Sequence, residues 1–147
     1  MERIKEDLVK LLNDALKLEH AARMQYLSHA ERIKGVTAEP IIGRLREIAS
    51  DEEKHEGKFR RLIGDYLGGM PAMETAETHN AATTSAILQV NLRDEKTAIG
   101  FYQTIYKKVM DNKAALPYEF ETLEHELRHI IIDEEEHVAE LNVLLGK

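Results

Sequence analysis

Hydrophobic residues recur every three or four positions over four long stretches of the chain, with polar residues between them. This spacing puts the hydrophobic side chains on one face of an α-helix, so it predicts four amphipathic helices. The helices are expected from about Arg3 to Lys34, from near Pro40 to the sequence YLGGMP, from the end of AATTS to about MDNKAAL, and from near Pro117 to Leu145. Thr84 or Ser85 is expected to cap the third helix.

The links between these helices differ in length. The first and third links are short, so the helices that they join should form two antiparallel hairpins. The second link, roughly Gly68 to Thr84, is long enough to return along a helix of about 40 Å when it is extended. The sequence therefore predicts an all-α, antiparallel four-helix bundle with a long crossover between helices 2 and 3, formed by one domain over residues 1–147.

Each predicted hydrophobic face is interrupted near its middle by acidic residues, in two helices together with histidine. The interrupting residues are Glu19 in the first helix, Glu52 and His55 in the second, Glu95 in the third, and Glu134 and His137 in the fourth. Within each hairpin they lie at similar distances along the chain from the turn. Residues at equal distances from the turn of an antiparallel hairpin lie at equal depth, so all six should meet in one layer at the bundle centre.

The two predicted hairpins also resemble each other in sequence. The pattern E-x-x-A-x-x-x-Y occurs at 19–26 and again at 95–102, and DEEKH at 51–55 matches DEEEH at 133–137. This internal repeat predicts two related halves around a pseudo-twofold axis.

Four ionised carboxylates in a hydrophobic layer would be strongly unfavourable, because burial removes their hydration and like charges repel. Two divalent cations would balance the four negative charges, and neutral histidine ligands leave that balance unchanged. A Glu and a His three positions apart share one helix face, so one helix can provide both a bridging carboxylate and an imidazole. We therefore expect a site with two metal ions, in which Glu52 and Glu134 bridge the ions and the terminal ligands are Glu19, His55, Glu95 and His137.

Residues next to these ligands have a supporting role in this interpretation. A histidine that binds a metal usually donates its other N–H to a carboxylate. Asp51 is expected to pair with His137 and Asp133 with His55, across the bundle. Tyr26 and Tyr102 have two interpretations: buried aromatic residues of the core, or partners of a ligand carboxylate and redox-active side chains. Five histidines and three charged residues lie off the hydrophobic faces and are expected at the surface: His20, His29, His79, His125, His129, Glu53, Lys54 and Glu56.

The absence of cysteine excludes disulfides, thiol catalysis and iron–sulfur clusters. Oxygen and nitrogen ligands favour iron or manganese, while zinc would fit the site without redox chemistry. The net charge of −7 argues against a nucleic-acid partner. No hydrophobic run approaches the roughly 20 residues needed to cross a bilayer, so no membrane partner is expected. The first residues, MERIKEDLVK, lack the hydrophobic core of a signal peptide, and a cytoplasmic location is expected.

The chain has one Glu on a helix followed by Glu-x-x-His on the next helix, and this pattern occurs twice over the four helices. In this pattern the chain resembles the ferritin-like di-iron carboxylate proteins. Within that group, Glu19 with QY at 25–26 and DEEKH at 51–55 look most like bacterioferritin and rubrerythrin. The resemblance implies two iron ions at the paired site and oxidation of Fe²⁺ by O₂ or H₂O₂. It also implies an electron donor that the sequence does not identify, and a homodimer or a larger homo-oligomer.

The sequence differs from those of bacterioferritins and rubrerythrins in three ways, and each difference narrows the expected function. Bacterioferritins often place a haem-ligating Met directly after the second-helix Glu, where this chain has Glu53, so haem is not expected. Rubrerythrins carry a Cys-rich module and an extra Glu at the position of Ala98, which speaks against a peroxide reductase. The chain has ten residues after His137, too few for the fifth helix of the storage shells.

Four functions remain as alternatives. The first is a ferroxidase, the second a subunit of an iron-storage shell, the third a rubrerythrin-like peroxide reductase, and the fourth a metal-stabilised helical interaction module.

Overall fold

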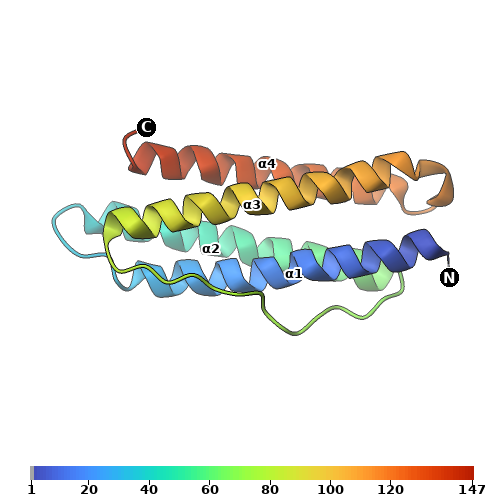
Figure 1. The fold of residues 1–147 in the computed structure, drawn as a ribbon, viewed down its shortest axis with the longest axis horizontal. Helices are drawn as coiled ribbons and strands as arrows, with labels where there is room; N and C mark the ends of the chain where they lie inside the picture. The colour runs from blue at the N-terminus through green and yellow to red at the C-terminus, as the bar shows by residue number, and fades with distance from the viewer. Residues whose placement is uncertain (1) are drawn as a thin grey trace.

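The computed structural model describes residues 2–147, and its four long helices form an antiparallel bundle (Figure 1). The helices are α1 (Arg3–Ala30), α2 (Ala38–Arg61), α3 (Thr84–Asp111) and α4 (Phe120–Leu144). α1 packs mainly against α2, and α3 packs mainly against α4, while α1–α3 and α2–α4 contacts join the two hairpins. Residues 2–147 contain no strand. The predicted all-α bundle is therefore confirmed.

The helix boundaries differ from the predicted ones by a few residues. α1 ends at Ala30 rather than near Lys34, and the chain then turns through Gly35, whose φ of 108° suits glycine. α2 begins at Ala38, which leaves Pro40 within its first turn, and continues into a π-helical segment, η1 (Leu62–Tyr66). A 3-10 segment, η2 (Lys113–Ala115), lies between α3 and α4.

The cap of α3 is Thr83, not Thr84 or Ser85 as predicted. The backbone of Thr83 is extended, and its side-chain hydroxyl accepts a hydrogen bond from the Ala86 amide at 3.1 Å. Three hydroxyl residues in a row made the sequence ambiguous, because each can cap a helix. The backbone conformation selects the first of them.

The crossover between η1 and α3 runs along α1 from one end of the bundle to the other (Figure 1). The Asn13 side chain binds it twice, donating to the Met70 carbonyl at 3.0 Å and accepting from the Ala72 amide at 2.7 Å. The crossover approaches α1 so closely that a Cβ atom at Gly69 would lie 2.7 Å from the Val9 side chain. The crossover is thus held against α1 by hydrogen bonds and close packing.

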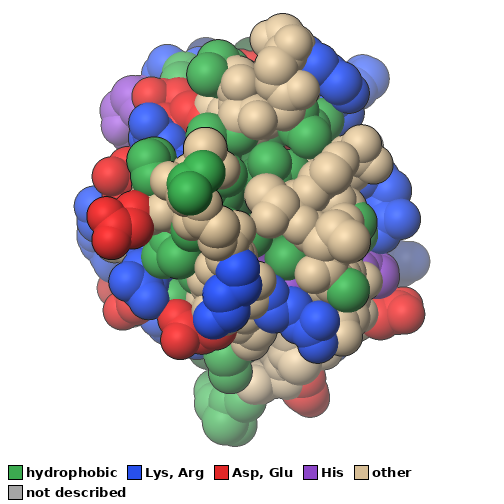
Figure 2. Space-filling model, turned by 90° about the vertical axis from the view of Figure 1, so that its left-hand side faces the viewer, with side chains coloured by type: hydrophobic (Ala, Val, Ile, Leu, Met, Phe, Trp, Pro, Cys, Tyr) green, Lys and Arg blue, Asp and Glu red, His purple; other side chains and the backbone are tan. Residues whose placement is uncertain are grey.

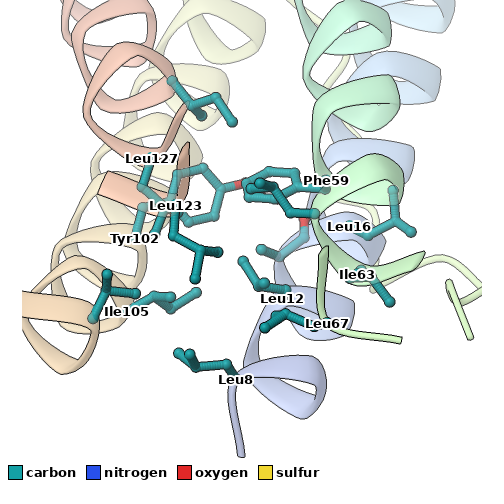
Figure 3. Close-up of a cluster of buried hydrophobic side chains, with 14 of the residues drawn as sticks. Leu8, Leu12, Leu16, Phe59, Ile63, Leu67, Tyr102, Ile105, Leu123 and Leu127 are labelled. Carbon is teal, nitrogen blue, oxygen red and sulfur yellow. The ribbon is translucent and has the colours of Figure 1, made fainter. Parts of the chain in front are cut away.

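Two clusters of buried hydrophobic side chains form the core. Figure 3 shows the first cluster, in which Phe59 and Tyr102 meet edge to face with ring centroids 5.4 Å apart. The second cluster lies toward the other end of the bundle and includes Tyr26, Ile48 and Leu88. In every helix, the predicted acidic and histidine residues fall between the segments that supply the two clusters. The core therefore has a polar layer between two hydrophobic halves.

The outer surface is mixed in charge. Figure 2 shows the end of the bundle that carries the α1–α2 turn, where acidic, basic and hydrophobic side chains all occur. Among residues 2–147, no helix combines the length and hydrophobicity needed to cross a membrane.

Candidate metal centre

The six residues predicted from the sequence lie together in the polar layer of the bundle. α1 and α3 each supply one carboxylate, and α2 and α4 each supply a carboxylate and an imidazole three positions apart. Each side chain belongs to a residue that is at most 2% exposed, and the six are Glu19, Glu52, His55, Glu95, Glu134 and His137.

Their donor atoms form two groups that share two residues. One group consists of Glu19, Glu52, His55 and Glu134, and the other consists of Glu52, Glu95, Glu134 and His137. In each group, one donor atom from every residue lies within 4.8 Å of the others. Glu52 and Glu134 thus occupy the shared positions, and each remaining residue belongs to one group.

The two groups have matching hydrogen bonds. His55 Nδ1 lies 2.8 Å from a Glu19 oxygen, and His137 Nδ1 lies 2.8 Å from a Glu95 oxygen. Each Nδ1 also lies 3.1 Å from the glutamate three residues earlier in its own helix. Both Nδ1 atoms therefore face the carboxylates, which is the orientation that would let them bind a metal ion in the same place.

The other nitrogen of each imidazole points to an aspartate. His55 Nε2 donates to Asp133 at 2.9 Å, and His137 Nε2 donates to Asp51 at 3.0 Å. The aspartates come from the opposite hairpin and are partly exposed. Each histidine is thereby fixed in orientation between a buried glutamate and an aspartate near the surface.

Burial changes the protonation of the layer. Loss of hydration, followed by repulsion from neighbouring glutamates, raises the pKa of Glu19, Glu52, Glu95 and Glu134 to about 8 each. Burial by itself lowers the pKa of His137, but the interactions of the imidazole with the nearby Glu134 and Glu95 carboxylates outweigh it and raise the pKa to about 12. The same balance raises the pKa of His55. Protons therefore supply the positive charge when no metal ion does.

The shared carboxylates lack hydrogen-bond partners. Both oxygens of Glu52 and both oxygens of Glu134 are buried and accept no hydrogen bond, because the imidazole nitrogens 3.1 Å away are directed at Glu19 and Glu95. An unpaired buried polar group costs about 1–3 kcal/mol, and more when it is charged. Buried carboxylates that are unpaired at the shared positions of two donor groups fit divalent cations, which would bind these oxygens.

The two tyrosines lie on opposite sides of the layer. The Tyr26 hydroxyl is buried without a hydrogen-bond partner, and the Tyr102 hydroxyl donates to the Ala15 carbonyl over 3.5 Å. Burial raises the pKa of both side chains well above its usual value. Neither hydroxyl is hydrogen-bonded to one of the six residues in this structure.

Two residues expected at the surface are buried. Glu56 is 3% exposed, and Arg23 Nε donates to its carboxylate at 2.5 Å. His29 is also 3% exposed, and its Nδ1 accepts from Asn91 Nδ2 at 3.0 Å. Their partners come from other helices, so the spacing within one helix gave no sign of them.

A polar cluster next to the layer was also missed from the sequence. Gln25 and Asn91 are buried, and Gln25 Nε2 donates both to Asn91 and to Asp94, at 2.9 Å each. The partners of Gln25 lie on α3, and no spacing within α1 indicates them.

Comparisons with known proteins agree with this geometry. Residues 9–147 match the family described as the ferritin-like domain. A ferritin-like, diiron-carboxylate protein from Bacillus anthracis aligns over 99% of both chains, with a TM-score of 0.90 and 23% identity. The bacterioferritin of Desulfovibrio desulfuricans aligns over 96% of this chain and 79% of its own, with a TM-score of 0.85 and 20% identity.

A third similar structure is a dodecameric thioferritin, a bacterioferritin-related protein from Bacteroides fragilis. It is 25% identical, has a TM-score of 0.81, and aligns over 97% of this chain and 86% of its own. No curated protein shows significant sequence similarity to the chain. Since the family match spans nearly the whole sequence and the fold is shared, this chain belongs to the ferritin-like domain family.

Proposed function

We propose that this protein is a di-iron oxidase, in its simplest form a ferroxidase that oxidises Fe²⁺ with O₂ or H₂O₂. The observation that carries the proposal is the pair of buried donor groups that share Glu52 and Glu134. Similar structures include a diiron-carboxylate protein and a bacterioferritin with a diiron site, which supports iron as the metal. Manganese fits the same oxygen and nitrogen ligands.

The residues of the site would have different roles in binding the metal ions. Four carboxylates would neutralise two divalent cations, with Glu52 and Glu134 between them. His55 and His137 would each complete one position, held by Asp133 and Asp51. Iron bound there would supply the electrons for reduction of the oxidant. The two hydrophobic clusters shield the layer from bulk water along the bundle axis, which strengthens its electrostatic interactions.

The proposed function does not include a haem group. Glu53, which follows Glu52, is exposed and offers no thioether sulfur. We also propose a cytoplasmic protein with a homo-oligomeric assembly and an electron donor still to be identified.

The test compares Glu52→Gln with Glu53→Gln. The two variants replace a carboxyl group by an amide at adjacent positions of α2, but only Glu52 is buried in the layer. On mixing anaerobic Fe²⁺-loaded protein with O₂, the parent and Glu53→Gln should develop the near-ultraviolet absorbance of Fe³⁺. In Glu52→Gln this absorbance should develop more slowly. Loss of a residue that only orients a metal ligand typically costs about 10- to 100-fold, and the loss of Glu52 should slow the oxidation by at least that much. Equal rates in the two variants would contradict the proposal.

An iron-storage shell is the second candidate, and the similarity to the dodecameric thioferritin favours it. In that case, the same centre would deliver Fe³⁺ to the interior of an assembled particle. Light scattering coupled to size-exclusion chromatography separates the candidates, since a dimer cannot enclose a mineral whereas a large closed particle can.

A further inference from the structure

A cavity of about 90 Å³ lies beside the polar layer, bounded by residues of α1, α3 and the crossover. Its lining includes exposed residues, among them Glu77 on the crossover and Thr97 on α3. It also includes buried carboxylates, among them Glu19 and Glu95. One continuous cavity thus connects the surface with the candidate metal centre. Its volume leaves room for several water molecules.

The inner part of the cavity suits a polar occupant. Small side chains, Ala22 and Ala98, leave the space open, and Tyr26 is among the residues that line it. The Tyr26 hydroxyl is fully buried and has no hydrogen-bond partner, and the oxygens of Glu52 and Glu134, which also line the cavity, are likewise unpaired. Several buried polar atoms therefore face this space without partners of their own.

The outer part of the cavity carries two carboxylates, Glu77 and Asp94, and is structurally anchored. Asp94 Oδ1 also accepts from the exposed Arg93 side chain at 3.3 Å. The Gln25 side chain donates to Asp94 Oδ2 at 2.9 Å and accepts from the His79 amide at 2.6 Å. His79 Nδ1 lies 2.8 Å from the same Asp94 oxygen. These bonds hold the crossover, with Glu77, over the cavity and hold the Asp94 carboxylate at its edge. Two carboxylates and one imidazole are thus gathered where the cavity meets solvent.

We propose that this cavity is the route by which a divalent cation enters the centre, with Asp94, Glu77 and His79 as its first binding point. This inference rests on the proposed function, since it assumes that the layer binds metal. A cleft lined by charges of one sign concentrates counter-ions and can raise association rates by about 10- to 1,000-fold. Two other large surface hollows are lined by none of the six residues of the centre.

The first test blocks the cavity with a matched pair of substitutions, Thr97→Trp and Thr104→Trp. Both threonines are exposed on α3, and each hydroxyl donates to the carbonyl four residues earlier at 3.1 Å. Only Thr97 lines the cavity. Binding of Co²⁺, followed by stopped-flow visible absorbance, should be at least about fivefold slower in Thr97→Trp than in the parent, with the same final amount bound. Thr104→Trp should load at the parent rate.

The second test removes charge without adding bulk. Glu77→Gln and Glu74→Gln make the same change at two exposed positions of the crossover, and only Glu77 lines the cavity. Glu77→Gln should slow Co²⁺ loading, and the difference should shrink as salt is added. Loading by Thr97→Trp and Glu77→Gln at the rates of their controls overturns the route while leaving the centre in place. A parent protein that binds no Co²⁺ in the layer overturns the proposed function as well.

Discussion

Among single residues, the aspartates that hold the two imidazoles have the most direct effect on the centre. Asp133 accepts from His55 Nε2 at 2.9 Å, and this bond lowers the pKa of Asp133. The charged aspartate makes the imidazole a stronger ligand and fixes which nitrogen faces inward. Asp51 has the same position relative to His137 in the other half. The role of each aspartate can be tested without altering any of the six residues of the layer.

Asp133→Ala should weaken metal binding in the half that contains Glu19 and His55. Loss of a residue that orients a metal ligand typically lowers affinity about 10- to 100-fold, and Co²⁺ titration should show one position weakened and the other retained. Glu135→Ala, which removes an exposed carboxylate two residues later in α4, is the control and should bind like the parent. Equal affinities in the two variants would contradict an orienting role for Asp133.

Tyr26→Phe should not destabilise the metal-free protein. The Tyr26 hydroxyl is buried without a partner, so its removal should raise the free energy of unfolding by about 1 kcal/mol or leave it unchanged. Tyr102→Phe is the matched comparison, because it removes a hydroxyl that reaches the Ala15 carbonyl. Urea unfolding of both variants, with and without Co²⁺, checks this. If Tyr26→Phe raises the free energy of unfolding only in the metal-free protein, the Tyr26 hydroxyl has a partner in the loaded protein. A clear decrease in the free energy of unfolding of the metal-free variant contradicts the prediction.

On the scale of whole elements, the positions of the crossover and of α3 depend on a few specific contacts. The crossover lies against α1 through Asn13 and through the close approach of Gly69 to Val9. α3 then begins at the Thr83 cap. These contacts determine where α3 starts and therefore the depth at which Glu95 enters the layer.

Thr83→Ala should lower the free energy of unfolding by about 1 kcal/mol, the usual effect of losing an N-cap side chain. Thr84→Ala is the control, because Thr84 is the first residue of the helix and the cap bond comes from Thr83. Chemical denaturation monitored by circular dichroism measures both. A larger loss in Thr84→Ala than in Thr83→Ala would show that the cap lies one residue later.

For the molecule as a whole, the polar layer divides the core and links stability to pH. Four carboxyl groups have their pKa raised from 4.5 to about 8 by burial and mutual repulsion. Between these values, the folded metal-free protein keeps protons that the unfolded chain has released. The free energy of unfolding therefore falls as pH rises through this range. The raised pKa of His55 and His137 acts in the same direction above pH 6.5.

Metal binding should reverse this dependence, because cations displace the protons and stabilise the ionised carboxylates. The melting temperature of the Co²⁺-loaded protein should exceed that of the chelator-treated protein by more at pH 8 than at pH 6. Differential scanning calorimetry at the two pH values measures the difference. An increment independent of pH would mean that metal binding releases no protons from the layer.

The sequence predicted the bundle and the crossover because both depend on regular spacing and on link length. The six residues of the layer could be singled out for the same reason, since each interrupts a hydrophobic face that is otherwise regular. Glu56 and His29 could not be found in this way. Their burial depends on Arg23 and Asn91, which lie on neighbouring helices, and no pattern within one helix reports such a partner.

What the sequence determined by itself is the fold class, the depth of the polar layer and the residues within it, because helical periodicity converts spacing into position. The tertiary structure decided how those residues relate to one another: which carboxylates are shared, which nitrogen of each imidazole faces inward, and which polar groups have no partner. It also decided that the crossover covers a cavity leading to the layer. These features arise between helices, where side-chain geometry and burial are set by packing rather than by order along the chain.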